Sequence, residues 1–378
     1  MSKAFTVYRD NCIICGHIYG IPETGVKRHA VILSHGFNGS QKETSPYAEY
    51  LAKNGFCTIT YDFYGGSHKE ESGGSLVDMT IETEKADLLT VIRHVRELPY
   101  VDTSELTILG CSQGGVISSL VASENPDLIQ NLVLVYPALC IPDNANSGRM
   151  LFFKFDPANV PDEVKSLGMR LNGDYIRQAQ KLDLIETIGK FPGRILLIYG
   201  KKDNVVPYCY AEKLIAQYEG RIESMPIEKG EHGYKKESLS TACGRILMFL
   251  KHHREILNIK VNITDVKTKF KGFTITADLY FYAEASGNYF QGHSRPGARD
   301  RQVRKGLKPV EFTADYILDG EAADSEKCSI HVINRNTGDG WIPTVSTDSR
   351  FLDFLNHTQC ECVEDHWKNG LTVRIYCE

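Results

Sequence analysis

The chain has 378 residues, of which 42% are hydrophobic and 24% are charged. This is the composition of globular proteins, and it excludes a disordered chain. The formal net charge of -5 makes nucleic acids and anionic membrane surfaces poor candidates for partners. No run approaches the about 18 to 20 apolar residues that a membrane-spanning helix needs. At roughly 150 residues per domain, the length predicts two domains.

The N-terminus and the cysteines indicate a cytoplasmic protein. The opening residues Met1-Ser-Lys-Ala-Phe5 run straight into polar and charged positions, without the apolar core of a signal peptide. The chain contains 11 cysteines, an odd count without a secretion signal. We therefore expect reduced thiols rather than a framework of disulfides.

The first two thirds of the chain predict an α/β fold. The opening residues indicate an antiparallel pair of strands at a sheet edge, over 5–8 and 13–19. Short β-rich runs then alternate with amphipathic segments such as 81–98, which Pro99 ends. Because these runs are apolar on both faces, they are typical of strands buried in a parallel, doubly wound sheet. The expected strands are 29–34, 56–61, 106–109, 131–136 and 194–199.

The last third of the chain has a different residue pattern. Here β-rich runs alternate with Gly and Asp turns, and only one helical stretch, 350–356, interrupts them. This pattern predicts a small all-β barrel or sandwich. We expect an α/β domain over 1–257 and an all-β domain over 262–378, with strands at 273–282, 310–317, 329–333 and 371–376.

The segment Leu109-Gly-Cys-Ser-Gln-Gly-Gly115 carries the most chemical information. Gly110-x-Ser112-x-Gly114 is the G-x-S-x-G pattern, set between a predicted strand and a predicted helix. The tight turn strains the serine backbone and lifts the hydroxyl above the sheet, and small flanking residues avoid clashes. The alternative is a Gly-rich turn that only caps a helix. The strand–turn–helix context favours Ser112 as a nucleophile.

A serine nucleophile needs a base, and the base needs an acid that orients it. Asp203 follows the predicted strand 194–199, and His232 lies in a loop before the helix that follows. Their separation leaves room for one helix and one strand. We expect His232 to be the base and Asp203 the acid, with Glu231 as a weaker alternative acid.

The oxyanion of a tetrahedral intermediate needs two N–H donors. We expect them from the backbone of Phe37, in the loop after strand 29–34, and of Gln113, directly after the nucleophile. Gly36, which has no side chain, lets the backbone of this loop approach the oxyanion. His35 is expected to hold this loop by hydrogen bonds rather than to take part in the chemistry.

Together these motifs resemble the α/β-hydrolase family over roughly residues 1–255, and more closely the bacterial cinnamoyl and feruloyl esterases. The matching pieces fall in the order of that family: His35-Gly-Phe37, Tyr61-Asp-Phe-Tyr-Gly65, Ser112-Gln-Gly-Gly115, Tyr136-Pro-Ala138, Phe155-Asp-Pro157, Gly173-Asp-Tyr175-Ile-Arg-Gln-Ala-Gln180 and Asp203-Asn-Val-Val-Pro207. The resemblance implies a lid inserted at about 138–192.

In the resembled esterases the lid closes over an aromatic acyl group, and polar lid residues meet its ring hydroxyl. Tyr175 matches the tyrosine with this role; the alternative is an aromatic residue of the lid core. Asn144 falls where some relatives carry an aspartate, and Leu151 where some carry a glutamine. The resemblance thus implies Tyr175, Asn144 and Leu151 as substrate-binding residues, the last two being departures from its pattern.

We therefore predict a serine carboxylesterase that acts through an acyl-enzyme on hydroxycinnamate or other small acyl esters, without a metal or other cofactor. A serine peptidase or an acyl-thioesterase would use the same three side chains and remains an alternative.

The C-terminal part resembles a family of small bacterial β-barrel proteins of unknown function, on pieces such as Glu284-Ala-Ser-Gly287, Asp300-Arg-Gln302 and Thr347-Asp-Ser349. The resemblance suggests a partly polar interior that could hold a small ligand. It leaves open a non-enzymatic, ligand-binding role for the barrel, and the barrel and the lid both offer surfaces for a homodimer.

Overall fold

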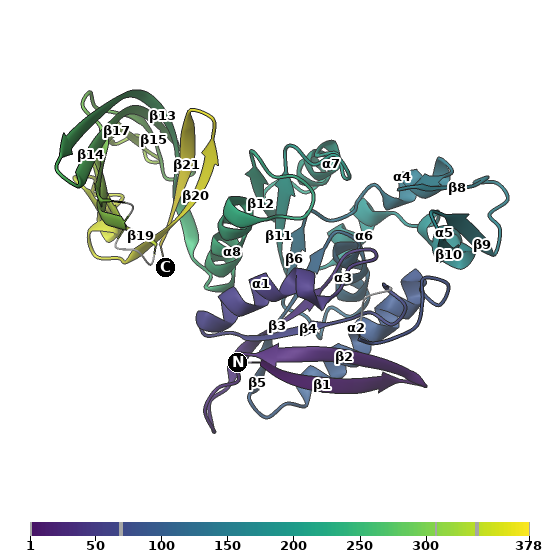
Figure 1. Ribbon diagram of the computed structural model, residues 1–378. Coiled ribbons are helices and arrows are strands. Elements are labelled where there is room, and N and C mark those ends of the chain that lie inside the picture. The colour runs from purple at the N-terminus through teal and green to yellow at the C-terminus, as the bar shows by residue number, and fades with distance from the viewer. Residues whose placement is uncertain (1, 68–70, 307, 337–339, 378) are drawn as a thin grey trace. The chain divides into compact units, whose positions relative to one another are not determined.

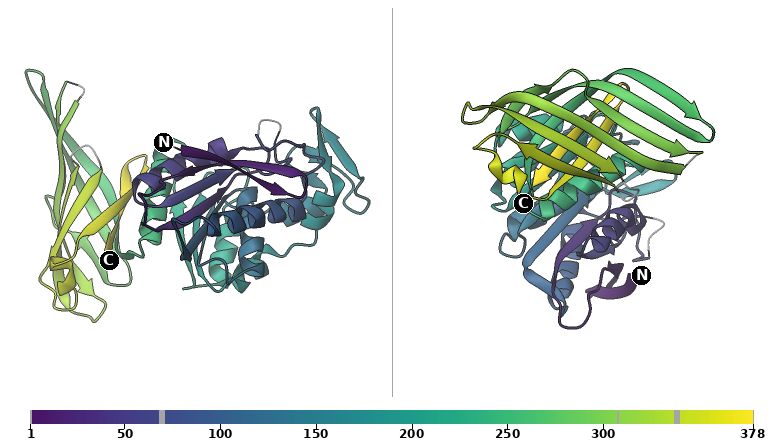
Figure 2. Two further views of the ribbon diagram at one scale, coloured as in Figure 1. Left: turned by 90° about the horizontal axis from the view of Figure 1, so that it is seen from below. Right: turned by 90° about the vertical axis from the view of Figure 1, so that its left-hand side faces the viewer.

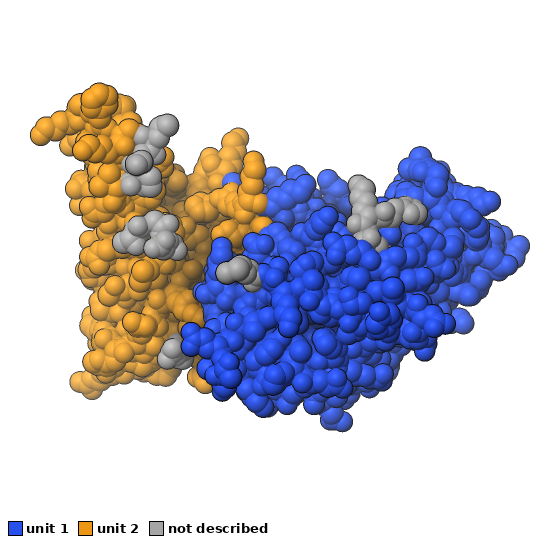
Figure 3. All heavy atoms as spheres, turned by 60° about the horizontal axis from the view of Figure 1, so that its bottom comes forward, with its two compact units in different colours: residues 1–235 blue, residues 236–378 orange. Residues whose placement is uncertain are grey.

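The computed structural model describes residues 2–67, 71–306, 308–336 and 340–377. Figure 3 shows two compact units, unit 1 over residues 1–235 and unit 2 over residues 236–378. The domain boundary that we expected between residues 257 and 262 lies inside the long strand β13 (Arg254–Lys271). The helix before it, α8 (Lys236–Leu250), groups with unit 2 because it packs on β20 (Cys360–Trp367). There the Thr241 hydroxyl donates a 2.6 Å hydrogen bond to the Glu364 carbonyl oxygen.

Unit 1 is built on an eight-stranded sheet with the order β1-β2-β4-β3-β5-β6-β11-β12 (Figure 1). As predicted, β1 and β2 pair antiparallel at one edge, and β3 to β6, β11 and β12 form the parallel part. The strands are β1 (Ser2–Arg9), β2 (Cys12–Tyr19), β3 (Arg28–Ser34), β4 (Cys57–Tyr61), β5 (Val101–Cys111), β6 (Asn131–Val135), β11 (Arg194–Gly200) and β12 (Ile222–Ile227). Every residue of β4 and β6 is buried, and most of their side chains are apolar, the exceptions being Thr58, Thr60 and Asn131.

The helices of unit 1 pack through their buried apolar residues. In α2 (Ile81–Arg96), Thr80 caps the first turn, and the buried apolar side chains include Ile81, Leu88 and Val95 at helical spacing. The others outside the insert are α1 (Gln41–Lys53), α3 (Gln113–Glu124) and α7 (Cys209–Gln217). Among the described residues, no helix combines the length and the apolarity needed to cross a lipid bilayer.

An insert lies between β6 and β11, where the resemblance implied a lid. It consists of short elements, most of which gather at one end of unit 1, whereas α6 packs against α3 (Figure 1). They are α4 (Ile141–Asn146), β7 (Arg149–Met150), β8 (Phe153–Lys154), β9 (Glu163–Ser166), β10 (Met169–Asn172), α5 (Gly173–Ala179) and α6 (Leu184–Lys190).

Besides α8, unit 2 consists of a nine-stranded antiparallel sheet, which confirms the predicted all-β architecture. Its order is β19-β18-β17-β15-β14-β13-β21-β20, with β16 paired to β14 and β17, and it curls around an interior (Figures 1 and 2). The remaining bounds are β14 (Thr274–Ser286), β15 (Phe290–Ser294), β16 (Arg299–Lys305), β17 (Lys308–Ala322), β18 (Lys327–Asn336), β19 (Trp341–Thr347) and β21 (Gly370–Cys377), with a 3-10 helix at Asp353–Asn356. The outermost strands approach where the Cys362 thiol contacts the Trp341 carbonyl oxygen at 3.6 Å.

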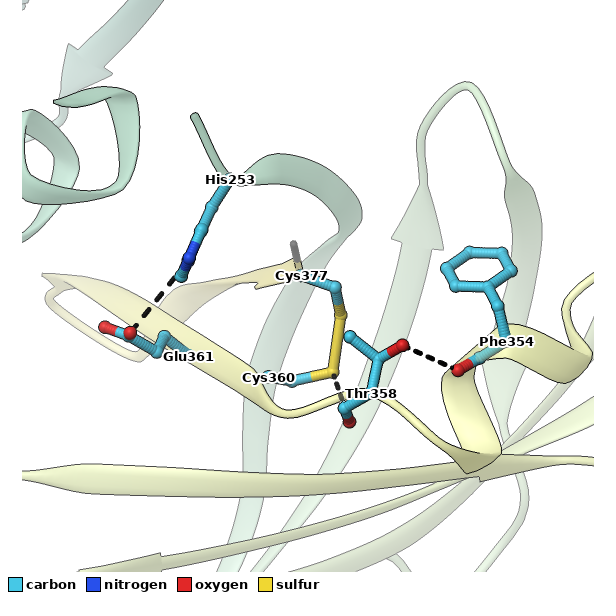
Figure 4. The surroundings of a disulfide bond; sticks show 6 residues. All are labelled: His253, Phe354, Thr358, Cys360, Glu361 and Cys377. Atoms are coloured by element: carbon cyan, nitrogen blue, oxygen red, sulfur yellow. Dashed lines mark hydrogen bonds and ion pairs between the residues drawn. A yellow bond between two sulfur atoms is a disulfide. The ribbon is translucent and has the colours of Figure 1, made fainter. Parts of the chain in front are cut away.

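The prediction that the cysteines are reduced thiols was wrong for one pair. Cys360 and Cys377 form a disulfide between β20 and β21 (Figure 4). The two residues face each other in the antiparallel register, and their Cα atoms are 4.7 Å apart. This separation suits a disulfide. The pairing depends on the register of two strands, which the spacing of cysteines along the chain does not reveal.

Candidate active site

Ser112 lies at the sharp turn between β5 and α3. Its φ of 53° and ψ of -120° are strained for a residue with a side chain. A Cβ atom on Gly110 would come within 2.2 Å of the Gly114 carbonyl oxygen, and one on Gly114 within 2.4 Å of the His35 carbonyl oxygen. Both flanking positions therefore require glycine, as the G-x-S-x-G pattern predicts.

His232 lies in the loop after β12, and its Nε2 atom is 2.9 Å from the Ser112 hydroxyl oxygen. The Tyr136 ring packs edge-on against the imidazole with a centroid distance of 5.0 Å. This contact helps to fix the ring plane. The sequence motifs gave Tyr136 only as part of the resemblance, without a role.

Asp203 follows β11 and accepts from the opposite side of the imidazole. Its Oδ2 atom is 2.8 Å from His232 Nδ1. Its Oδ1 atom accepts the backbone N–H groups of Val205 and Val206, both at 2.8 Å. The Asp203 side chain is only 2% exposed, whereas Glu231 is exposed. The structure thus brings together the three side chains expected from the sequence, with Asp203 rather than Glu231 on the histidine.

The loop after β3 passes close to the serine. A Cβ atom on Gly36 would be 3.1 Å from the Ser112 Cβ atom, so glycine allows this approach. Phe37 follows in this loop, and Gln113 begins α3, where backbone N–H groups have no preceding helical turn to bond. The loop that carries Phe37 and the start of α3 therefore both lie next to the serine.

His35 holds this loop, as the sequence predicted. Its Nδ1 is 2.8 Å from the Gly36 carbonyl oxygen, and its Nε2 accepts the Phe63 backbone N–H at 3.1 Å. Burial lowers the pKa of His35, which favours the neutral ring that this pattern needs: a proton on Nδ1 and a lone pair on Nε2.

The side chain of Gln113 is fixed at both ends. Its Oε1 accepts the Tyr175 hydroxyl at 2.5 Å, and its Nε2 donates to Glu84 Oε2 at 2.7 Å. Tyr175 is 1% exposed. Its hydroxyl therefore bonds within the protein, as in the alternative that Tyr175 is an aromatic residue of the lid core. The Phe37 ring lies against the same tyrosine and against Phe153 of the insert, at centroid distances of 6.5 and 6.4 Å.

Glu84 and Asp87 are buried acids of α2 that the sequence motifs did not identify. Burial raises the pKa of Glu84 to about 8 and that of Asp87 to about 6. Asp87 accepts from Arg9 at 2.5 Å, whereas Glu84 is bonded by the neutral amide of Gln113. The available signal was an acid at helical spacing from Ile81 and Leu88, on the apolar stripe of the helix.

The two remaining predicted residues lie elsewhere in the insert. The Asn144 side-chain amide donates to the Cys140 sulfur at 3.4 Å. Leu151 is 45% exposed in the turn between β7 and β8, with φ of 53°. For neither residue does the described part of the chain show a contact with Ser112 or His232.

Residues 25–181 match a family model described as serine aminopeptidase, S33. Est1E from Butyrivibrio proteoclasticus, in a structure with ferulic acid bound, is 27% identical with a TM-score of 0.61; the match covers 66% of this chain and 98% of that one. The esterase domain of a Rhodothermus marinus protein, 15% identical with a TM-score of 0.50, covers 67% of this chain and 98% of that domain and is similar in fold alone. These matches confirm the α/β-hydrolase fold expected for the first two thirds of the chain.

Curated relatives match shorter stretches. An uncharacterized 31.7 kDa protein of Escherichia coli is 32% identical over 98 residues, which is 26% of this chain and 33% of that protein. The uncharacterized protein YfhR of Escherichia coli O157:H7 is 24% identical over 203 residues, 53% of this chain and 62% of the relative. The chain thus spans less than two thirds of the length of either.

Proposed function

We propose that this chain, whose unit 1 is an α/β-hydrolase similar to Est1E, is a serine carboxylesterase that acts on small acyl esters. The observation that carries the proposal is the line of hydrogen bonds from Ser112 through His232 to Asp203, with distances of 2.9 and 2.8 Å. A nucleophile, a base and an orienting acid in this arrangement perform acyl transfer on several unrelated folds.

In the proposed mechanism, Ser112 Oγ attacks the ester carbonyl carbon while His232 Nε2 takes the hydroxyl proton. Asp203 accepts the Nδ1–H of the ring, which holds the required tautomer and stabilises the imidazolium. His232 then gives the proton to the leaving alcohol. A water molecule enters, loses a proton to His232 and releases the acid from the acyl-enzyme.

The negative oxygen of each tetrahedral intermediate would be bound by the backbone N–H groups of Phe37 and Gln113. Each such donor contributes about 3 to 4 kcal/mol of transition-state stabilisation. The contacts of the Gln113 side chain with Tyr175 and Glu84 would hold the residue that supplies one of these donors.

We propose hydroxycinnamate as the acyl class, with other small acyl groups next. Two features support an aromatic acyl group: the similarity to Est1E, which was solved with ferulic acid, and the contact of Phe37 with Phe153 of the insert. The Tyr175 hydroxyl is engaged by Gln113, so recognition of a ring hydroxyl by this residue would require that bond to be shared or broken.

A serine peptidase is the second candidate, because the matching family model is described as a serine aminopeptidase. An acyl-thioesterase would use the same three side chains. Neither changes the role proposed for Ser112; they differ in the leaving group.

The test is kcat/KM of the full chain for methyl ferulate, p-nitrophenyl butyrate, a butyryl thioester and an aminoacyl p-nitroanilide. We expect the two oxygen esters to be the better substrates and Ser112→Ala to abolish their turnover. Ser118→Ala is the matched control, because that buried hydroxyl on α3 has no partner among the described residues. A preference for the anilide would replace the esterase by the peptidase, and full activity of Ser112→Ala would refute both.

A further inference from the structure

The curled sheet of unit 2 encloses a cavity of about 370 Å³. This volume falls in the range of roughly 300 to 1,000 Å³ typical of small-molecule sites. Alternate residues of the strands form its wall, because successive side chains of a strand point to opposite faces. In β16 and β17 these residues are Asp300, Gln302, Arg304, Phe312, Ala314 and Tyr316.

Much of the wall is aromatic. The rings of Phe281 and Tyr316 meet edge-on at a centroid distance of 5.2 Å, and those of Phe312 and Trp341 lie 6.4 Å apart. Trp367 also lines the cavity. These rings would accommodate an apolar body, and their faces attract cations. The chain has only two tryptophans, and both line this cavity.

Two acids also face the cavity, and one carboxylate oxygen of one of them has no hydrogen-bond donor in the described part of the chain. Asp300 Oδ2 accepts from the Gln302 amide at 2.8 Å, but Asp300 Oδ1 is buried and has no hydrogen-bond partner among the described residues. Glu364 is near enough for the two charges to repel, and its Oε2 is 3.3 Å from His366 Nε2. Burial raises the pKa of both acids.

Of the side chains on the wall that can carry a positive charge, His366 lies beside Glu364 and offsets part of the charge of that acid only. Arg304 is exposed and lies over the Phe312 ring at 5.1 Å, and Lys368 is also exposed. The interior thus offers two acids, one with an unfilled acceptor, beside aromatic faces. Such surroundings favour a ligand that brings a positive charge and N–H donors.

We propose that this cavity binds a small molecule that carries an ammonium group on an aromatic or aliphatic body. The ammonium would donate to Asp300 Oδ1 and offset the repulsion between Asp300 and Glu364, while the body would lie against the rings of Tyr316, Trp341 and Trp367. This site is separate from Ser112 in the chain, and the proposal does not depend on the esterase activity.

The test is a titration of the full chain followed by tryptophan fluorescence, which reports on Trp341 and Trp367. The probes are phenethylamine, phenethyl alcohol and hydrocinnamate, which share an aromatic body but differ in charge. We expect a saturable change with the amine, binding at least tenfold weaker with the alcohol, and no change with hydrocinnamate. Equal binding of amine and alcohol, or no saturable change with the amine, would overturn the proposal.

Substitutions of the two acids test whether they recognise the positive charge of the ligand. Asp300→Asn and Glu364→Gln should each weaken amine binding at least tenfold and leave alcohol binding unchanged. Glu311→Gln removes an exposed acid of β17 and should leave both unchanged. Full amine affinity in both cavity variants would also contradict the proposal. If a variant fails to fold, the comparison of the three probes on the unaltered chain still decides the outcome.

Discussion

Tyr175 and Gln113 are joined by a 2.5 Å hydrogen bond that ties the insert between β6 and β11 to the residue after Ser112. The far side of the Gln113 amide donates to the buried Glu84 of α2. A movement of the insert would therefore displace the start of α3, where one of the proposed oxyanion donors lies.

This bond predicts the effect of Tyr175→Phe. The substitution leaves the buried Gln113 Oε1 without a donor, and we expect kcat to fall about tenfold, equally for methyl ferulate and for methyl cinnamate, which lacks ring hydroxyls. KM should change little. A loss confined to the ferulate would instead assign Tyr175 to recognition of the ring hydroxyl.

Asp203 should affect the rate of the reaction by fixing the tautomer of His232. Asp203→Asn keeps the shape of the side chain but can donate to Nδ1, which favours the wrong tautomer. We expect kcat for p-nitrophenyl butyrate to fall about ten-thousand-fold, with the fold retained by circular dichroism. The control Glu231→Gln changes the exposed neighbour of His232 and should keep full activity. Comparable losses in both variants would contradict the assigned acid.

Glu84 should make stability depend on pH. Its pKa rises from an ordinary 4.5 to about 8 in the folded chain, so between these values the folded state holds a proton that the unfolded state has lost. The free energy of unfolding should therefore fall as pH rises through this window and level off above about 8.

The measurement compares urea unfolding of the unaltered chain and Glu84→Gln across this pH window. The variant should gain stability relative to the unaltered chain as pH rises, because glutamine has no proton to lose. Glu97→Gln, at the exposed end of the same helix, should run parallel to the unaltered chain. A pH-independent difference for Glu84→Gln would refute a buried, protonated Glu84.

The disulfide should stabilise unit 2. Cys360 and Cys377 are 17 residues apart, and a cross-link over a loop of this length contributes about 3 kcal/mol. We expect Cys360→Ser to lower the free energy of unfolding by this order, and a reductant to do the same to the unaltered chain. Cys209→Ser, at an exposed free cysteine, should have no such effect. Equal thiol counts with and without reductant, in denaturant, would show that the bond is absent.

Local patterns were enough to predict the elements that position the site. Apolar runs predicted the buried strands. Gly110 and Gly114 predicted a turn so tight that no larger residue fits at these two positions. The chain order of Ser112, Asp203 and His232 also predicted which side chains meet. The strands and the turn are encoded locally, because a strand's burial and a turn's backbone conformation limit the residue types at each position, whereas the meeting of the three side chains follows from the chain order that this fold uses.

By itself, then, the sequence determined the α/β and all-β halves of this protein and the set of Ser112, Asp203 and His232. Only the tertiary structure decided that Tyr175 and Glu84 both form hydrogen bonds with the Gln113 side chain, that Cys360 faces Cys377, and that Asp300 and Glu364 line one cavity. Each of these contacts joins segments through strand register or helix packing. Such contacts depend on how whole elements fit together, and no local spacing along the chain specifies them.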